Sequence, residues 1–165
     1  MPVPTDTTRR YRILFVCLGN ICRSPAAEGI MLHLLQERGL SRCVEVDSAG
    51  TYAGHAGELP DARMRAHAAR RGYLLEHRSR PVTDDDFDRF DLIIGMDDNN
   101  IDRLRRMAPD VEAMAKIHRM TDYARHYVHD HVPDPYYSGA EGFELVLTIL
   151  EDACEGLLDT LYPRK

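Results

Sequence analysis

Short apolar runs alternate with amphipathic stretches along most of the chain. The run at 12–16 (RILFV) has the length of a buried strand, and 44–50 (VEVDSAG) predicts a second strand. Apolar residues recur at helical spacing between them, in a stretch that Ser24 and Pro25 open as N-cap and first helical residue and that Gly39 ends. This order of strand, helix and strand predicts a right-handed parallel crossover.

The second half of the chain continues the alternation. Helices are predicted over 61–71, after Thr83 and after Asp97, and strands over 91–96 (DLIIGM) and 114–117 (MAKI). We therefore expect a single doubly wound α/β domain, with a four-stranded parallel sheet and helices on both faces.

The clearest helical pattern follows Ser138, which with Glu141 has the spacing of a capping box. Behind it the apolar residues form one stripe: Phe143, Val146, Leu147, Leu150, Cys154, Leu157, Leu158 and Leu161.

Length and composition fit one globular domain of 165 residues, 44% hydrophobic and 29% charged. Residues 1–10 lack apolar periodicity and predict a loose tail, so the domain is expected over 11–165. The net charge of −6 disfavours nucleic acid and anionic membrane as partners. No apolar run approaches the ~20 residues of a membrane span, and the N-terminus lacks the apolar core of a signal peptide.

The cysteine usage is typical of a reducing compartment. Four cysteines, Cys17, Cys22, Cys43 and Cys154, are too few and too scattered for a secreted disulfide scaffold. We therefore expect a cytoplasmic protein with reduced thiols.

The segment 17–24 (CLGNICRS), called the cysteine loop below, follows the first predicted strand, where doubly wound sheets bind ligands. Its backbone N–H groups and the following helix N-terminus can hold an anion. Gly19 and Asn20 readily accept left-handed backbone angles, and the guanidinium of Arg23 suits two phosphate oxygens at once. A thiol at Cys17 should ionise readily there and become a nucleophile aimed at phosphorus.

Two other phosphate or metal sites are excluded for this loop. It lacks the Gly-Lys-Ser/Thr ending of an ATP-binding phosphate loop. Its Cys-x4-Cys pair has no second pair nearby, so it is not a standard zinc site. A structural cysteine before an ordinary helix cap would explain Cys17 alone, but not the whole combination.

A candidate acid for the leaving group lies in the segment 132–139 (VPDPYYSG). Asp134 stands between two prolines that stiffen its loop, and the rings of Tyr136 and Tyr137 can flank an aromatic substrate. Pro-Asp-Pro alone is an ordinary turn, so this interpretation depends on its pairing with the cysteine loop.

The chain resembles the low-molecular-weight protein tyrosine phosphatases. The matching segments are VCLGNICRSP at 16–25, DSAGT at 47–51, DLIIGMD at 91–97 and DPYY at 134–137, in the order of the family.

The resemblance implies a two-step mechanism. Cys17 would attack phosphorus and form a phosphocysteine. Asp134 would protonate the departing phenolate and then act as base for the hydrolytic water. Arg23 would hold the phosphate together with the backbone amides of its loop. The implied phosphate-binding residues are Leu18, Gly19, Asn20, Ile21, Cys22 and Arg23.

The resemblance also implies supporting roles and no metal or organic cofactor. Ser24 would hydrogen-bond the sulfur, and Ser48 and His77 would hold Asn20 by hydrogen bonds and so lock the loop. The implied partner is a phosphotyrosine-containing protein, and a tyrosine kinase could modify Tyr136 and Tyr137. We expect a monomer, because one core accounts for the apolar residues.

The pocket mouth departs from the family. Members often carry a large aromatic residue in the loop near Gly54 and His55, whereas here Tyr52 is the nearest. The expected pocket residues are Tyr52, Tyr136 and Tyr137. Peptide preference is therefore not transferred.

Three alternatives stay open. Arsenate reductases share the loop but need two further cysteines close together, whereas Cys43 stands alone and Cys154 falls on the apolar stripe. Protein arginine phosphatases typically have threonine where this chain has Ile21, whose apolar side chain suits an aromatic ring. A non-catalytic phosphate-binding module would be expected to lack Cys17 or Asp134, and both are present.

Cys22 suggests a redox role. Because the loop curls round one anion, its sulfur could come close to that of Cys17. The hypothesis is that Cys22 captures an oxidised Cys17 as a reversible disulfide.

Overall fold

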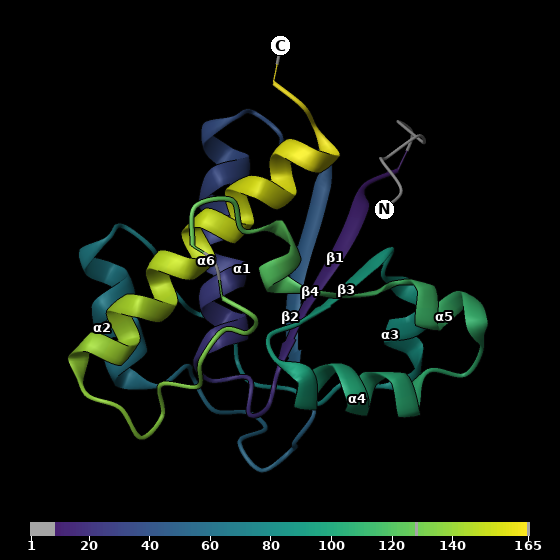
Figure 1. The fold of residues 1–165 in the computed structure, drawn as a ribbon, viewed down its shortest axis with the longest axis horizontal. Helices are drawn as coiled ribbons and strands as arrows, with labels where there is room; N and C mark the ends of the chain where they lie inside the picture. Colours follow the sequence, from purple (N-terminus) through teal and green to yellow (C-terminus); the bar gives the residue numbers. More distant parts are fainter. Residues whose placement is uncertain (1–8, 128, 165) are drawn as a thin grey trace.

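The computed structural model describes residues 9–127 and 129–164. Its four-stranded parallel sheet has the order β2-β1-β3-β4, which confirms the predicted α/β fold class (Figure 1). The strands are β1 (Tyr11–Cys17), β2 (Val44–Gly50), β3 (Leu92–Gly95) and β4 (Ile117–Arg119). Cys17, the last residue of β1, lies opposite Gly50 of β2, at the carboxyl edge of the sheet.

Helices cover both faces of the sheet. On one side lie α1 (Arg23–Glu37), α2 (Ala62–Arg70) and α6 (Ala140–Leu161). On the other lie α3 (Asp84–Arg89), α4 (Asp98–Met107) and α5 (Val111–Ala115), and a short 3-10 helix, η1 (Met120–Tyr123), follows β4.

Strand β1 divides the core because successive side chains of a strand point to opposite faces. Ile13 and Phe15 pack with α1 and α6, whereas Leu14 and Val16 pack with α3, α4 and α5. All four side chains are fully buried. A strand buried on both faces reads as a continuous apolar run, which is the pattern of 12–16.

Three helices begin within one residue of the predicted positions, and each start is capped. The Asp61 carboxylate accepts hydrogen bonds from the backbone N–H groups of Arg63 and Met64 at the start of α2. Thr83 and Asp97 head capping boxes at α3 and α4. The stripe of α6 is also confirmed, because all eight of its predicted apolar residues are buried.

Two other helix starts differ from the prediction. α1 begins at Arg23, with Cys22 as N-cap, and the buried Ser24 side chain turns toward Cys17 instead of capping. α6 has Gly139 as N-cap and no side-chain cap bond, so the capping box predicted at Ser138 is wrong. The N–H of Ser138 donates to the carbonyl of Pro135 and belongs to the preceding turn.

The fourth strand was predicted over 114–117, but it spans Ile117–Arg119. Met114 and Ala115 belong to α5, which the Asp110 side chain caps by accepting from the N–H of Ala113 at 2.8 Å. A short apolar run fits a strand or a buried helical turn equally well, so its pattern could not separate the two.

Most of the predicted tail, residues 1–8, lies outside the described residues. Arg9 forms an ion pair with Asp91 at 2.7 Å. Within 9–127 and 129–164, no helix has the length and apolar character needed to cross a membrane.

Candidate active site

The cysteine loop connects the end of β1 to the start of α1, as predicted. Asn20 adopts a left-handed backbone conformation, with φ of 55°. Gly19 does not, so its predicted left-handed angle is wrong. Its lack of a side chain still matters, because a Cβ there would lie 3.0 Å from the His55 ring.

The loop rests on the end of β2. The N–H groups of Thr51 and Tyr52 donate to the carbonyls of Cys17 and Leu18 at 3.0 and 2.9 Å. A Cβ at Gly50 would lie 2.8 Å from the Leu18 carbonyl oxygen, so the close approach requires glycine.

The Cys17 sulfur lies among polar groups although the residue is almost fully buried. Its Sγ is 3.0 Å from the hydroxyl oxygen of Ser24. The N-terminus of α1 begins six residues later, where the helix dipole favours negative charge. The sulfur therefore lies beside a hydrogen-bonding hydroxyl, at the end of the sheet where α1 begins.

Arg23 is 2% exposed and is held by groups from two other segments. Its Nη1 donates to Asp97 Oδ2 at 2.7 Å and to the carbonyl of Val132 at 3.1 Å. Burial disfavours the charged guanidinium, but the thiolate of Cys17 and the carboxylate of Asp97 outweigh it and raise the pKa of Arg23. The second nitrogen, Nη2, lies 3.7 Å from Asp134 Oδ2.

The segment carrying Asp134 is anchored beside β3. The N–H of the fully buried Val132 donates to the carbonyl of Met96 at 2.8 Å. Asp134 Oδ1 accepts from the N–H of Tyr136 at 3.1 Å, while the carboxylate stays 43% exposed. A solvent-accessible carboxylate beside Arg23 can give or take a proton.

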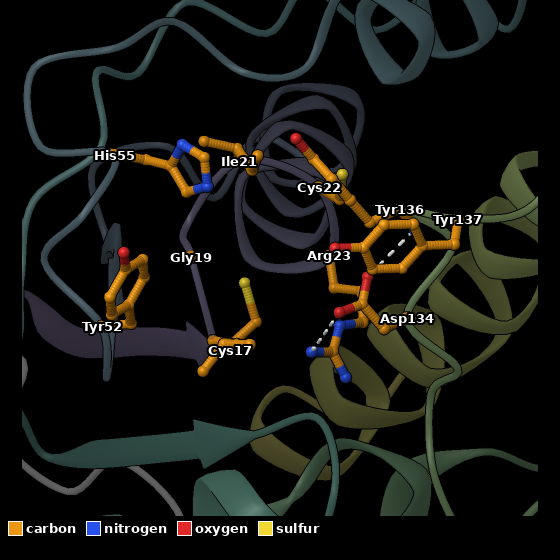
Figure 2. A pocket seen from close by; sticks show the side chains of 11 residues that line it. Cys17, Gly19, Ile21, Cys22, Arg23, Tyr52, His55, Asp134, Tyr136 and Tyr137 are labelled. Atoms are coloured by element: carbon orange, nitrogen blue, oxygen red, sulfur yellow. Dashed lines mark hydrogen bonds and ion pairs between the residues drawn. The ribbon is translucent and has the colours of Figure 1, made fainter.

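These groups line one cavity of about 310 Å³. Figure 2 shows the sulfur of Cys17 at its base, with Arg23 and Asp134 on one side and the ring of Tyr52 on the other. His55, in the loop that the family resemblance places at the pocket mouth, also lines it, and its Nδ1 lies 2.6 Å from Glu58 Oε2. The lining residues are Cys17, Leu18, Gly19, Ile21, Cys22, Arg23, Tyr52, His55, Asp134, Tyr136 and Tyr137.

Asn20 is fully buried, and both the nitrogen and the oxygen of its side-chain amide form hydrogen bonds. Its Nδ2 donates to the hydroxyls of Ser24 and Ser48 at 2.7 and 3.0 Å. Its Oδ1 accepts from the backbone N–H of Arg80 at 3.1 Å, a partner that no local sequence pattern predicts.

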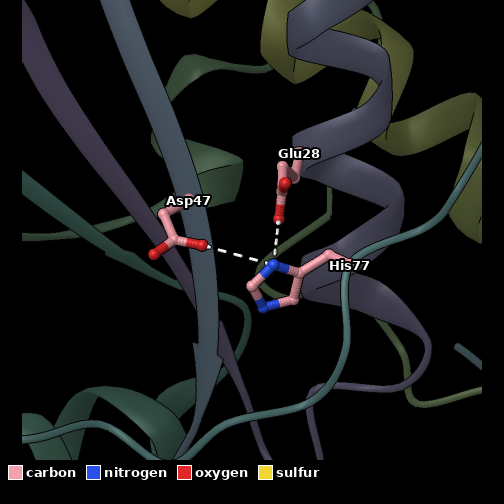
Figure 3. A group of neighbouring side chains, drawn as sticks. All are labelled: Glu28, Asp47 and His77. Atoms are coloured by element: carbon pink, nitrogen blue, oxygen red, sulfur yellow. Dashed lines mark ion pairs between the residues drawn. The ribbon is translucent and has the colours of Figure 1, made fainter. Parts of the chain in front are cut away.

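His77 differs from the expectation. No hydrogen bond joins it to Asn20 in the described part of the chain; its Nδ1 faces Glu28 and Asp47 instead, at 3.6 and 3.4 Å (Figure 3). Each of the three residues offers a possible metal-ligand atom within 4.8 Å of the others. The guanidinium of Arg80 already pairs with Asp47 at 3.0 Å, so these residues form a network of charged and polar groups and not a metal site.

Comparisons with known proteins agree with this geometry. The family model described as "Low molecular weight phosphotyrosine protein phosphatase" matches residues 12–165. The chain belongs to the low molecular weight phosphotyrosine protein phosphatase family.

Relatives in this family cover nearly the whole chain. A low molecular weight protein-tyrosine-phosphatase of Streptomyces coelicolor is 43% identical over 150 residues, 90% of this chain and 92% of its own. A crystal structure of a protein tyrosine phosphatase from Entamoeba histolytica, with Hepes in its active site, has TM-score 0.90 and 46% identity over 92% of this chain and 96% of its own. The structure named Drosophila arginine phosphatase has TM-score 0.86 and 33% identity, over 93% of this chain and 99% of its own. The enzyme class that these comparisons support is protein tyrosine phosphatase.

Two further cysteines of this phosphatase, Cys43 and Cys154, lie away from the pocket. Cys43 is exposed at the start of β2, and Cys154 is fully buried in α6. Neither lines the cavity, so among the described residues no pair of further thiols stands ready to relay a disulfide from Cys17.

Proposed function

We propose that the protein hydrolyses phosphotyrosine monoesters through a phosphocysteine on Cys17. The observation that carries this proposal is the composition of one cavity. A sulfur, a paired guanidinium and an accessible carboxylate line it together with several aromatic rings. Each of these groups has a separate task in an in-line displacement.

In the first step the Cys17 thiolate forms a bond to phosphorus while the bond to the phenolic oxygen breaks. Arg23 and the backbone amides of Leu18 to Arg23 hold the equatorial oxygens, where negative charge is greatest. Asp134, protonated at this point, transfers its proton to the departing oxygen.

In the second step the Asp134 carboxylate takes a proton from water as that water attacks phosphorus. The sulfur–phosphorus bond breaks and the electron pair returns to Cys17. Ser24, 3.0 Å from the sulfur, donates its hydroxyl hydrogen to the returning thiolate and makes it a better leaving group.

The walls of the cavity favour an aromatic substrate. Tyr52 and His55 stand on one side and Tyr136 on the other, and Ile21 adds an apolar surface. Flat rings on both sides of a slot fit a phenyl phosphate better than a short aliphatic one.

Colour release from p-nitrophenyl phosphate tests the mechanism. Wild type should release p-nitrophenolate, Cys17→Ser should release none, and Asp134→Asn should be slower by about 10² to 10⁴. Mass spectrometry of acid-quenched wild type should find phosphate on Cys17. Phosphate binding without turnover in the wild type would favour the binding module instead.

Phosphoarginine is the second candidate substrate, supported by the likeness to the Drosophila arginine phosphatase. Matched phosphotyrosine, phosphoserine and phosphoarginine peptides separate the two. We expect phosphotyrosine to be hydrolysed fastest, and Ile21→Thr to shift the ratio toward phosphoarginine. A wild type that prefers phosphoarginine would replace the tyrosine proposal.

We also propose redox protection by Cys22, which lines the same cavity as Cys17. Peroxide would oxidise the Cys17 thiolate to a sulfenic acid, and the Cys22 thiol would displace water to form a disulfide. Burial raises the pKa of Cys22, so it remains a thiol until then. Wild type should recover after peroxide and dithiothreitol, and Cys22→Ser should recover less; equal recovery would remove this role.

Tyr136 and Tyr137 are the proposed targets of a tyrosine kinase. Tyr137 is 96% exposed and accessible to a tyrosine kinase, whereas Tyr136 is half-buried near Arg63. After kinase treatment, mass spectrometry should find more phosphate on Tyr137 than on Tyr136. A cytoplasmic setting is supported by the four free cysteines, and one continuous core supports a monomer.

A further inference from the structure

We propose that a groove along α2 binds a segment of the phosphotyrosine protein in which apolar side chains and carboxylates lie about four residues from the phosphotyrosine. This inference deepens the proposed function and rests on it. The groove, called the α2 groove below, has a volume of about 700 Å³ and shares no lining residue with the cavity of the cysteine loop. Figure 1 shows α2 at the outer edge of its layer of helices, away from the sheet.

Apolar side chains make up most of the α2 groove. Ala62, Ala66 and Ala69 follow one another at helical spacing, so they lie on one face of α2, and all three are exposed. Leu59 and Leu74 line the same groove and are exposed as well, Leu74 to 76%. Covering this surface with the apolar side chain of a partner removes it from water and is favourable. The small alanine side chains leave room for that partner to approach the helix.

Two arginines give the α2 groove a positive charge. Arg65 and Arg78 line it, and Glu76 is the one carboxylate among its described lining residues. Neither guanidinium forms an ion pair within 9–127 and 129–164, whereas the neighbouring Arg63 pairs with Asp61 at 2.9 Å. The chain as a whole has a net charge of −6, so this local excess of positive charge is unlike the rest of the molecule. Its charge is complementary to an acidic partner.

Backbone carbonyls hold both arginines in place and leave part of each guanidinium unoccupied. Arg65 Nε donates to the carbonyl of Pro60 at 2.9 Å, and Arg78 Nη1 donates to the carbonyl of Gly57 at 2.9 Å. In the described part of the chain, both terminal nitrogens of Arg65 and the Nη2 of Arg78 remain for a carboxylate. Because the side chains are already fixed, little conformational entropy is lost when a carboxylate binds.

The α2 groove is continuous with the mouth of the pocket. His55 lines the pocket and Leu59 lines the groove, and a span of four residues cannot exceed about 14 Å. The segment between them turns, because the N–H of Glu58 donates to the carbonyl of His55 at 2.9 Å. An extended peptide rises about 3.3 Å per residue, so about four residues reach from one site to the other.

The start of α2 makes a second connection between the two sites. The N–H of Asp61 donates at 2.8 Å to the carbonyl of Ile21, which lines the pocket. The next residue, Ala62, lines the groove, and Arg63 lies over the ring of Tyr136 in the pocket, 5.4 Å from its centroid. A peptide whose phosphotyrosine enters the pocket therefore crosses the first turn of α2 to reach the groove.

The test measures kcat and KM for two phosphotyrosine peptides. Both carry leucine about four positions from the phosphotyrosine on each side, next to glutamate in one peptide and to lysine in the other. In wild type, KM for the glutamate peptide should be about fivefold lower, with equal kcat, because docking holds substrate and transition state alike. Every rate is divided by that for p-nitrophenyl phosphate, which is too small to reach the groove and measures the pocket alone.

Variants of the α2 groove separate its charge from its apolar surface. Arg65→Glu should reverse the preference between the two peptides, and Arg65→Gln, a milder change, should abolish it. Leu74→Ser should raise KM for both peptides equally, because both carry leucine. Arg70→Glu is the matched control, since Arg70 is exposed on the same helix but does not line the groove, so it should keep the preference of wild type.

Binding of the labelled peptides to Cys17→Ser, followed by fluorescence anisotropy, gives the same comparison without turnover. Equal affinity of the two peptides would overturn the proposal, as would equal effects of Arg65→Glu and Arg70→Glu, which would show an effect of overall charge. A dimer in sedimentation that Arg65→Glu alone dissociates would assign the groove to a second copy of the chain and overturn the proposal too. A wild type that releases no phosphate would contradict the proposed function, while peptide binding would still decide the role of the groove.

Discussion

At the scale of single residues, the buried guanidinium of Arg23 shows how the site is held. A buried charge is stable only when it is paired and hydrogen-bonded. Asp97 and the Val132 carbonyl occupy Nη1, which leaves Nη2 for the pocket. The fork is therefore oriented before any phosphate binds.

The pairing gives the first prediction. Asp97→Asn keeps an acceptor but removes the charge, so Arg23 should be less well fixed and kcat/KM should fall about tenfold. Asp98→Asn is the matched control, since Asp98 is exposed and pairs with Arg119 instead. Steady-state kinetics with p-nitrophenyl phosphate measures both; equal activity of the two variants would contradict the role given to Asp97.

Glu28 gives a second prediction, on stability. Its pKa rises from an ordinary 4.5 to about 7 in the folded protein. The folded state therefore binds more protons than the unfolded state between these values, and stability falls as pH rises through them. The shift corresponds to roughly 3 kcal/mol, an upper estimate.

Glu28→Gln cannot ionise and escapes this loss. Its free energy of unfolding should increase relative to wild type as pH rises from about 4.5 to 7, as measured by urea denaturation. A difference between the two proteins that stays constant over that range would show that Glu28 titrates normally.

At the scale of elements, the end of β2 holds the cysteine loop in place by backbone hydrogen bonds and close packing. Strands β1 and β2 are in register from Tyr11 opposite Val44 to Cys17 opposite Gly50, and the loop backbone that follows β1 lies close to Gly50. Loop shape therefore depends on an element about 30 residues away.

Gly50→Ala should displace the loop, because its Cβ would lie 2.8 Å from the Leu18 oxygen and 3.1 Å from the Asn20 nitrogen. We expect a loss of kcat/KM of at least about tenfold and a destabilisation of about 1 to 3 kcal/mol. Gly139→Ala is the control, since it has open space and should change stability by no more than about 0.5 kcal/mol. An active Gly50→Ala would show that the loop adjusts easily.

At the scale of the whole molecule, α6 closes the larger half of the core. Its buried stripe packs on α1 and on one face of the sheet, and the core is continuous from β1 to Leu161. The segments around Cys17 and Val132 thus share this half of the core with α6.

Leu150→Ala should destabilise the whole fold by about 2 to 5 kcal/mol, because it leaves a cavity in a fully buried position. Leu145→Ala, on the exposed side of the same helix, should cost much less. Urea unfolding followed by circular dichroism and by activity should give coincident transitions if the molecule unfolds as one unit. Separate transitions would show that α6 detaches independently.

Much of the fold could be predicted because the relevant signals are local. Strand β2 was predicted over its full length, and the starts of the helices that follow Thr83 and Asp97 were identified. Each depends on residues within a few positions of one another. The short strand β4 could not be placed, because its neighbours satisfy a helix as well.

The sequence by itself determined the order of strands and helices and the composition of the cysteine loop, because periodicity and turn chemistry are properties of neighbouring residues. Only the tertiary structure decided that Asp97 holds Arg23 and that Glu28 connects to Asn20 through Ser48. These hydrogen bonds join residues 20 to 74 positions apart in the chain. Their partners are chosen by how the helices and strands pack, and no local pattern encodes that choice.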